Sequence, residues 1–398
     1  MVLSPSIAHA RGATVLERML DRFDGSVLDG AQRVSRIRLV ITDGGTWDAL
    51  VSPSGATLEQ ARTSVRPAAV IGADAATWER VADDLRGGMD AYREGRLVVR
   101  HNLHLGVSFL AATSGMTGPE RLRFDCVSTS LGTISVCAAG LGEPVILLHG
   151  LGATKVSFLP TIAALAPTYR TIALDLPGFG DSTKPVLAPY HPPFFARAVC
   201  ELMDELGIER AHFVGNSMGG RIALEIGLRH PERACSLSLL APSLAWRRPR
   251  PWAPLVRVLR PELGLVQLSP RWAIEAVVHQ IVPRAAASWL HAGVDEFLRS
   301  YTTARGRVAF YAAARQIYLE EPHGARGFWT RLESLATPAL FVWGKLDRLV
   351  PFGFAAHVRR ALPSSRHLEL DCGHVPQLER PQETHGAIAA FLAEHRAV

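Results

Sequence analysis

Cysteine is scarce in this chain, and its distribution excludes several kinds of protein. The 398 residues include five cysteines, which are widely spaced and form neither a Cys-x-x-Cys pair nor a Cys/His metal-ligand pattern. An odd number of scattered cysteines is typical of free thiols in a reducing compartment. We therefore expect a cytoplasmic protein without a disulfide framework or a cysteine-based metal site.

Long hydrophobic runs and concentrated positive charge are also lacking. No stretch approaches the roughly 18 consecutive apolar residues of a transmembrane helix, and the first residues lack the pattern of a signal peptide. The formal net charge is +6, but the basic residues are spread out, unlike the stripe or tail that binds nucleic acid. We expect a soluble protein with no nucleic-acid partner. The basic stretch Trp246–Trp252 leaves open a peripheral membrane contact, although a solvated turn fits it better.

What is present is ample material for a folded core. Hydrophobic residues make up 48% of the chain and charged residues 20%, as in soluble globular proteins. A chain of 398 residues is long for one domain, and residues 113–120, Thr-Ser-Gly-Met-Thr-Gly-Pro-Glu, have the composition of a linker. We predict an accessory domain over residues 1–115 and a larger domain over residues 122–398.

The larger region alternates short apolar runs with helical patterns. The clearest runs are 145–148, 171–174, 212–214, 236–240 and 339–343. Such runs suit parallel strands that are covered on both faces, and their alternation with helices predicts a doubly wound, mostly parallel α/β sheet. Residues 243–336 break the alternation with helical segments rich in Trp, Arg and Leu. We interpret them as a helical cap over the carboxyl edge of the sheet.

One motif in this region carries nucleophile chemistry. Gly215-Asn-Ser-Met-Gly219 follows one of the predicted strands and precedes a helix. This is the G-x-S-x-G nucleophile elbow, in which a serine stands at the tip of a sharp strand-to-helix turn. The turn is too tight for large flanking side chains, which explains the two glycines. We predict that Ser217 is the nucleophile.

A nucleophilic serine needs a base, and the base needs a carboxylate that orients it. In this fold they follow in the order Ser, Asp or Glu, His. Asp347 comes just after the predicted strand 339–343, and His374 lies in a loop after the last strand. The segment after strand 236–240 offers no carboxylate, and Asp371 is poorly placed to reach the ring. We predict Asp347 as the acid and His374 as the base.

Two backbone amides are expected to stabilise the oxyanion that forms in acyl transfer. They are the N–H of Met218, which opens the helix after the elbow, and the N–H of Leu151, which lies in a loop of small residues after strand 145–148. His149 is expected to shape this loop through hydrogen bonds and not to transfer a proton. The residues expected to contact substrate are Gly150, Gly152, Asn216, Trp246 and Val375.

The motifs resemble the α/β-hydrolase superfamily over roughly residues 122–398. The resemblance is carried by His149-Gly150, by Asp175-Leu-Pro-Gly-Phe-Gly-Asp-Ser182, by the elbow, by the Asp347 loop and by Gly373-His374. It implies an eight-stranded sheet with a lid inserted after the sixth strand. It also implies that no metal and no organic cofactor is needed. The loop 175–182 is then scaffold beside the active site.

Two activities of this superfamily fit the motifs. The first is an esterase or lipase, in which Ser217 forms an acyl-enzyme with an apolar, medium or long acyl or lipid-like substrate. The second is a carbon–carbon hydrolase of the meta-cleavage type, which residues 215–220 resemble. Those enzymes typically carry Ser-Gly-Pro-Gly after His-Gly, whereas this chain has Leu151-Gly-Ala-Thr154, so we prefer the esterase. A third hypothesis is a lipid carrier with a vestigial hydrolase half, which the presence of all three triad residues disfavours.

Residues 30–112 have a pattern of their own. Strand-like runs at 37–41, 47–51 and 68–71 precede a helix from Asp74, a Gly-flanked helix, a strand at 96–100 and an apolar helix over 103–112. This resembles the SCP-2-like sterol-carrier domain, best over residues 73–99. The resemblance implies a small α+β domain with an apolar tunnel for a lipid; the alternative is a domain that only packs or dimerises. The predicted fold class is thus a capped α/β-hydrolase sheet with a small α+β N-terminal domain.

Overall fold

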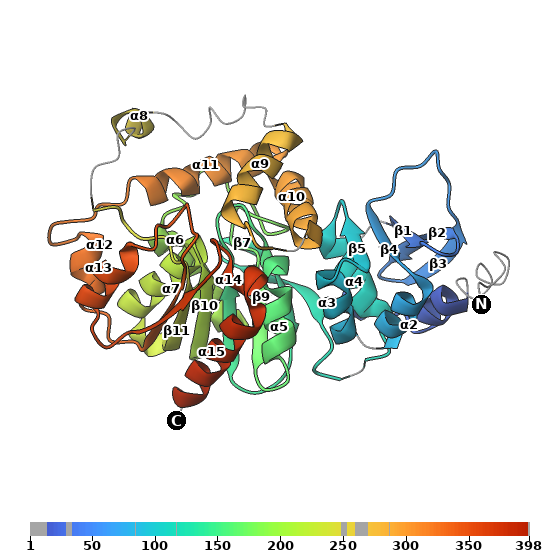
Figure 1. The fold of residues 1–398 in the computed structure, drawn as a ribbon, viewed down its shortest axis with the longest axis horizontal. Coiled ribbons are helices and arrows are strands. Elements are labelled where there is room, and N and C mark those ends of the chain that lie inside the picture. Colours follow the sequence, from blue (N-terminus) through green and yellow to red (C-terminus); the bar gives the residue numbers. More distant parts are fainter. Residues whose placement is uncertain are drawn as a thin grey trace.

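The chain forms two separate β-sheets, one of five strands and one of eight. The computed structural model describes residues 14–28, 34–83, 85–116, 118–247, 253–258, 270–285 and 287–396. The smaller sheet lies near the N-terminus at one end of the elongated molecule, and the larger sheet occupies the other end (Figure 1). Two sheets of this kind agree with the predicted fold class, a larger α/β sheet with an additional N-terminal domain.

The smaller sheet has the strand order β3-β2-β1-β4-β5. Its strands are β1 (Ser35–Ile41), β2 (Thr46–Ser52), β3 (Gly55–Gln60), β4 (Ala69–Ala73) and β5 (Leu97–Arg100). Strands β1 and β4 pair in parallel, and the other neighbours pair antiparallel. Buried residues alternate along β1 and β4, as expected for strands with one face on a core. The sequence analysis anticipated four of these strands and missed β3.

Helices cover one face of the smaller sheet. They are a helix over residues 14–21, α2 (Ala75–Asp83), α3 (Leu85–Arg93) and α4 (Leu103–Thr113). Helix α4 begins after Asn102, whose side chain accepts a hydrogen bond from the Leu105 N–H at 2.9 Å and so caps the helix. Trp78 of α2 is fully buried and donates its indole N–H to the Val40 carbonyl at 3.0 Å. The helix over 14–21 was not predicted.

The larger sheet has the order β13-β12-β11-β10-β8-β9-β7-β6. Its strands are β6 (Arg123–Thr129), β7 (Gly132–Ala139), β8 (Pro144–Leu148), β9 (Arg170–Leu174), β10 (Ala211–Asn216), β11 (Ala234–Leu240), β12 (Ala339–Gly344) and β13 (Arg366–Leu370). The pairings from β9 through β8 to β13 are parallel, whereas β7 runs antiparallel to β6 and β9. This is the mostly parallel, eight-stranded sheet that the resemblance implied.

Both faces of this sheet are buried, which explains its continuous apolar strands. The flanking helices and 3-10 turns are η2 (Lys155–Phe158), α5 (Leu159–Leu165), α6 (Pro192–Glu205), α7 (Met218–Arg229), α13 (Phe354–Ala361), α14 (Pro376–Glu379) and α15 (Pro381–Glu394). In β8, Val145 and Leu147 join a core that includes α5 and α15, whereas Ile146 and Leu148 join a second core with α6 and α7. The first core continues without a break into the core of the N-terminal sheet.

A helical insertion separates β11 from β12, the sixth and seventh strands of the larger sheet. Its helices are α8 (Ala253–Val258), α9 (Arg271–Ile281), α10 (Ala287–Tyr301), α11 (Ala304–Tyr318) and α12 (Phe328–Leu332). Helices α9, α10 and α11 lie across the edge of the sheet (Figure 1), as the cap prediction requires. Residues 248–252, part of the basic stretch considered for membrane contact, lie outside the described residues. No helix within the described ranges is long and apolar enough to cross a bilayer.

The N-terminal region is joined to the cap through a buried carboxylate on α10. Asp295 accepts hydrogen bonds from the Arg100 side chain at 2.7 Å and from the His101 N–H at 2.9 Å, and it pairs with Arg271 of α9 at 2.6 Å. Burial opposes ionisation of Asp295, but these donors outweigh burial and lower its pKa.

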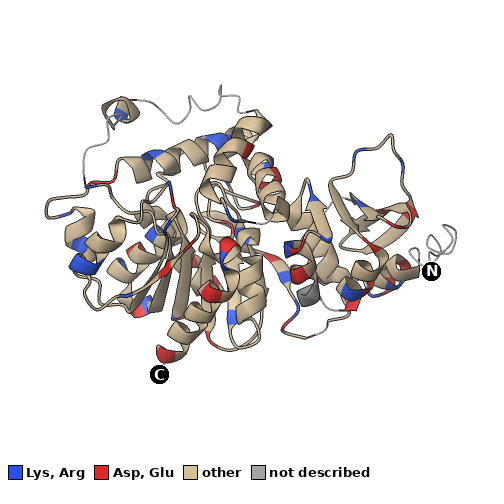
Figure 2. Cartoon of the chain, in the orientation of Figure 1, with Lys and Arg blue, Asp and Glu red and all other residues tan. Residues whose placement is uncertain are grey.

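Over the rest of the molecule, acidic and basic residues are interspersed (Figure 2).

We predict that Asp295→Ala lowers the free energy of unfolding by about 2 kcal/mol. Removing one partner of a buried ion pair leaves the remaining charges uncompensated, and the partial exposure of Arg100 and Arg271 reduces that cost. Chemical denaturation measures the change. The control is Asp83→Ala, whose pair with Arg22 is exposed and whose loss costs no more than about 0.5 kcal/mol. Equal losses in both variants would contradict a joining role for Asp295.

Candidate active site

Ser217 stands at a strained turn between β10 and α7. Its backbone angles are φ 52° and ψ −112°, a conformation that costs a non-glycine residue about 1–3 kcal/mol. The turn is tight because a Cβ on Gly215 would lie 2.4 Å from the Gly219 backbone, and a Cβ on Gly219 would lie 1.9 Å from the Leu148 carbonyl oxygen. Both glycines are therefore required by contact, as the elbow motif predicts.

The loop after β8 lies directly against this serine. A Cβ added to Gly150 would be 3.4 Å from the Ser217 Cβ, so the backbone of this loop approaches the elbow closely. Leu151 follows in the same loop. Met218 is the first residue of α7, and its N–H therefore has no acceptor within the helix. The two residues predicted to form the oxyanion hole thus lie on two elements that adjoin Ser217, and their role stays a prediction.

His149 holds the loop in place through both ring nitrogens. Its Nε2 accepts a hydrogen bond from the Leu176 N–H at 3.0 Å, and its Nδ1 lies 2.8 Å from the Gly150 carbonyl oxygen. Since Nε2 accepts, Nδ1 carries the proton and donates. Burial lowers the pKa of His149, which keeps the ring neutral. The contacts match the shaping role expected for this residue.

The predicted acid and base are in hydrogen-bond contact. His374 Nδ1 lies 2.7 Å from Asp347 Oδ2, and both side chains are buried. The other carboxylate oxygen of Asp347 accepts the N–H groups of Leu349 at 2.8 Å and Val350 at 3.0 Å. These bonds fix the Asp347 carboxylate. The contact uses only Nδ1 of His374, so Nε2 can bind a second group.

Asp371 does not take part in this contact. It lies 2.8 Å from Arg284 and is largely exposed.

Glu379 holds the loop that contains His374, here called the histidine loop, through hydrogen bonds. The sequence analysis missed this residue. Its carboxylate accepts the N–H of Gly373 at 2.9 Å, of Val375 at 3.2 Å and of Arg284 at 3.0 Å. Gly373 and Val375 flank His374 in the sequence, and Arg284 follows the cap helix α9. Burial raises the pKa of Glu379. The spacing of five residues after His374 was the only sequence signal for this role.

Two further hydrogen bonds tie the histidine loop to its surroundings. The His374 N–H donates to the carbonyl of Ile281, the last residue of α9, at 2.9 Å. The Asn216 amide donates to the His374 carbonyl and to the Leu240 carbonyl, both at 3.0 Å. Asn216 was predicted to contact substrate, and the structure gives its amide group this bracing role at the cavity wall.

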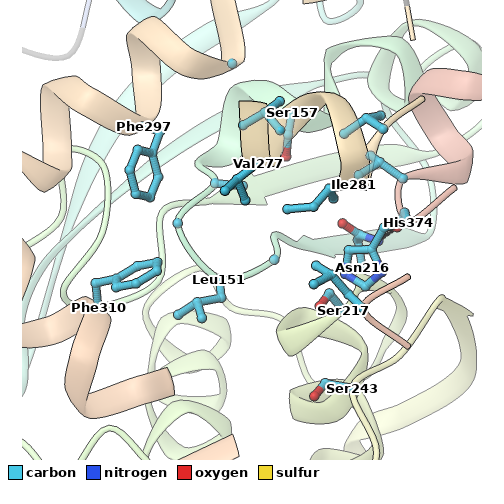
Figure 3. A pocket seen from close by; sticks show the side chains of 18 of the residues that line it. Leu151, Ser157, Asn216, Ser217, Ser243, Val277, Ile281, Phe297, Phe310 and His374 are labelled. Atoms are coloured by element: carbon cyan, nitrogen blue, oxygen red, sulfur yellow. Dashed lines mark hydrogen bonds between the residues drawn. The ribbon is translucent and has the colours of Figure 1, made fainter. Parts of the chain in front are cut away.

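Ser217 and His374 open into a cavity of about 690 Å³, which we call the main cavity. Figure 3 shows the two side chains together on one wall, with Phe297 and Phe310 across from them. The five residues predicted to contact substrate all line it, namely Gly150, Gly152, Asn216, Trp246 and Val375. Leu151 lines it as well, whereas Met218 and Asp347 lie behind the wall.

The far wall of the main cavity is formed mainly by apolar and aromatic side chains of the cap. Phe297 and Tyr301 stack with ring centroids 4.9 Å apart, and Phe310 meets both edge-on. Among the cap tryptophans, Trp246 and Trp289 line the cavity, whereas Trp272 is exposed. The aromatic residues on α10 and α11 were not predicted, because helical spacing alone does not distinguish a pocket lining from a core.

The main cavity is poor in charge. Among its described lining residues there is no Lys or Arg, and Glu296 is the one carboxylate. One oxygen of that carboxylate pairs with Arg299 of the same helix. Across the described ranges, no three His, Cys, Asp or Glu side chains gather as metal ligands would.

The loop 175–182 supports the site without lining the cavity. Asp175 and Lys155 form a fully buried pair at 2.6 Å; burial favours the neutral amine of Lys155, but the nearby carboxylate outweighs burial and raises the pKa of Lys155. The Ser182 hydroxyl donates to the Asp175 carbonyl at 2.6 Å. Asp181 pairs with Arg299 of α10 at 2.6 Å. This loop thus connects the base of the site to the cap.

The family comparison places most of these elements in one known fold. A family model described as the alpha/beta hydrolase fold matches residues 143–381. That range contains β8 to β13, the elbow, the cap and the histidine loop. The N-terminal sheet lies outside it.

Three individual proteins are similar over this part of the chain. A 2-hydroxy-6-oxo-6-phenylhexa-2,4-dienoate hydrolase of Burkholderia cepacia is 30% identical, over 64% of this chain and 89% of that protein. A pimeloyl-[acyl-carrier protein] methyl ester esterase of Aeromonas hydrophila is 30% identical, over 65% and 99%. The crystal structure of a membrane phospholipase A superposes with a TM-score of 0.55 and 30% identity, over 70% and 87%.

Two acetyltransferase components of acetoin cleaving systems are also similar. The proteins of Pseudomonas putida and Cupriavidus necator are 31% and 30% identical. This chain spans 64% of the length of each.

We predict that Gly219→Ala reduces turnover by at least about 100-fold, because the added Cβ collides with the Leu148 carbonyl and displaces the elbow. Gly386→Ala is the control: it lies on the exposed face of α15 with open space at its Cβ, and it is expected to stabilise the fold by about 0.5–1 kcal/mol. Steady-state kinetics and thermal unfolding measure the two effects. Full activity in Gly219→Ala would contradict the close contact at the elbow.

Proposed function

The chain belongs to the α/β-hydrolase family, and from this premise we propose that it hydrolyses carboxylic esters with an apolar acyl group through an acyl-enzyme on Ser217. The observation that carries the proposal is the placement of Ser217 and of the Asp347-bound His374 on the wall of one apolar cavity. A serine, an oriented imidazole and backbone donors are the parts that acyl transfer requires. The turn in which Ser217 adopts its strained backbone angles holds the side chain at its tip.

In the first half of the proposed reaction, the Ser217 hydroxyl adds to the ester carbonyl carbon while His374 Nε2 takes its proton. The Asp347 carboxylate at 2.7 Å stabilises the imidazolium that forms. The carbonyl oxygen becomes an oxyanion, which accepts hydrogen bonds from the Met218 and Leu151 amides. The tetrahedral intermediate collapses, the alcohol leaves with the proton from His374, and the acyl group stays on the serine.

In the second half, water replaces the alcohol. His374 takes a proton from the water as its oxygen adds to the acyl carbon, and the same two amides hold the oxyanion. Collapse breaks the bond to the Ser217 oxygen, which regains its proton from the imidazolium. The products are a carboxylic acid and the free enzyme, and no cofactor enters the balance.

The lining of the main cavity supports an apolar acyl group. Hydrocarbon gains about 0.8 kcal/mol per buried methylene group, and the aromatic wall around Phe297 and Phe310 offers such burial. Two of the similar proteins are named as a methyl ester esterase and a phospholipase A. These names favour ester chemistry with acyl substrates.

A carbon–carbon hydrolase is the second candidate, and the Burkholderia cepacia relative favours it. The compound in that protein's name is a dienoate, which carries a carboxylate. A buried carboxylate is costly unless it is paired, and the described lining of the main cavity offers no Lys or Arg for it. This charge argument places the ester ahead of the dienoate.

The N-terminal region enters the proposal as an accessory domain. We keep the division into residues 1–115 and 122–398, the SCP-2-like resemblance, the cytoplasmic location and a peripheral membrane contact as predictions. A lipid carrier with a vestigial hydrolase half is disfavoured, because Asp347 lies in hydrogen-bond contact with His374 and because His374 and Ser217 line the same cavity.

We predict that the protein hydrolyses p-nitrophenyl esters and that Ser217→Ala loses at least about 1000-fold in kcat/KM, since the residual catalysis without a nucleophile comes only from binding and the oxyanion hole. Release of p-nitrophenol from acetyl to palmitoyl esters measures it. Ser243→Ala is the control: this hydroxyl lines the same cavity and its loss should change kcat/KM by no more than a few-fold.

The same proteins should be assayed with 2-hydroxy-6-oxo-6-phenylhexa-2,4-dienoate. Cleavage of the dienoate combined with inertness toward every ester would overturn the esterase proposal in favour of carbon–carbon hydrolysis. Ester turnover that survives in Ser217→Ala would overturn the acyl-enzyme.

A further inference from the structure

A second, smaller cavity lies where the N-terminal region packs against the larger sheet. It measures about 70 Å³, and we call it the junction cavity. Its walls come from α3, β5 and α4 on one side and from α5 on the other. Representative lining residues are Leu97, Val107 and Leu110 from the N-terminal region and Leu159 and Ile162 from α5.

The junction cavity adjoins the main cavity through two shared residues. Leu103, the first residue of α4, and Trp289 of α10 line both. The two side chains therefore form the partition between the cavities. The main cavity, which begins at Ser217, thus ends at a wall whose far side belongs to the N-terminal region.

Trp289 is held in this partition by the N-terminal region itself. The ring of Tyr92 meets it edge-on with centroids 4.7 Å apart. Tyr92 is fixed in turn, because its hydroxyl donates to the Ser288 carbonyl at 3.1 Å and its carbonyl accepts the Ser288 hydroxyl at 2.7 Å. The N-terminal region thereby sets the position of the residue at the end of the main cavity.

The apolar lining of the junction cavity favours hydrocarbon groups over polar groups. Among its described lining residues, Glu120 is the one charged side chain, and almost all the others are apolar. A polar group placed there would lose its hydrogen bonds to water without replacement. A methyl end of an acyl chain has no such bonds to lose.

We propose that the junction cavity receives the methyl end of the substrate's acyl chain, so that the N-terminal region determines the longest chain the enzyme takes. The inference rests on the proposed ester hydrolysis at Ser217. Each methylene group that passes the partition is buried in apolar surroundings and strengthens binding about fourfold. Esters too short to reach Leu103 and Trp289 do not sense the junction cavity.

Two opposite changes at Val107 test this proposal, because Val107 lines the junction cavity and not the main one. Val107→Phe fills the cavity and is expected to lower kcat/KM for the longest accepted p-nitrophenyl esters by roughly 15- to 60-fold, the loss of two or three buried methylene groups. Val107→Ala enlarges the cavity and should shift the chain-length optimum upward. Butyrate hydrolysis should stay within twofold of the native rate in both.

Val98→Phe is the matched control. Val98 lies on the same strand as a cavity residue, Val99, but is partly exposed on the other side. The same added ring at that position should leave the chain-length profile unchanged. Butyrate turnover with native profiles in both Val107 variants would overturn the inference while leaving the esterase intact.

A binding measurement separates failure of the inference from failure of the proposed function. Calorimetric titration of the uncharged methyl esters of saturated fatty acids of 8 to 16 carbons into Ser217→Ala, which lacks the nucleophile, requires no turnover. Affinity should rise with chain length, and the rise should be blunted when Val107→Phe is added but not when Val98→Phe is added. Identical profiles in the two double variants would overturn the inference even if the protein hydrolyses no ester.

Discussion

The close contact between the Gly219 backbone and the end of β8 is the constraint on which the site depends. It leaves no room for a side chain on Gly219, and the Gly219 backbone leaves none on Gly215. Ser217, between these glycines, has φ 52°. A strained residue of this kind persists only where its surroundings fix it. Here the Ser217 N–H donates to the Leu240 carbonyl of β11 at 2.9 Å, and α7 packs behind the turn. Because β10 lies between β8 and β11, both neighbouring strands contact the turn and hold Ser217 at its tip.

Hydrogen bonds connect the cap and the N-terminal region to the loop that contains His374. The end of α9 accepts the His374 N–H, and the start of the same helix pairs through Arg271 with Asp295. Asp295 is held in turn by Arg100 from the N-terminal sheet. A continuous series of hydrogen bonds and one helix thus connects the accessory sheet to the histidine loop. The shared hydrophobic core runs along the same path, so the two sheets are packed as neighbours and not merely tethered.

The fold was largely predictable because its signals are local. Apolar runs gave the parallel strands, and Gly215 and Gly219 gave the elbow. The places of Asp347 and His374 after predicted strands gave the acid and the base. Strand β3 was missed because its residues are exposed or half-buried and show no clear alternation. The role of Glu379 and the aromatic wall of the cap depend on contacts between segments distant in sequence. The junction cavity depends on how α4 meets α5, which no pattern in either helix encodes.

The most direct test of the account is whether Ser217 is the residue that becomes covalently modified. The protein would be treated with an alkyl fluorophosphonate, digested and analysed by mass spectrometry for the modified peptide. We expect one adduct, on the peptide that contains Ser217, with no labelling of Ser217→Ala. Labelling should be reduced in Asp347→Asn, which lacks the carboxylate that orients His374. An adduct on another serine, or undiminished labelling of Ser217→Ala, would contradict the assignment of the nucleophile and the mechanism built on it.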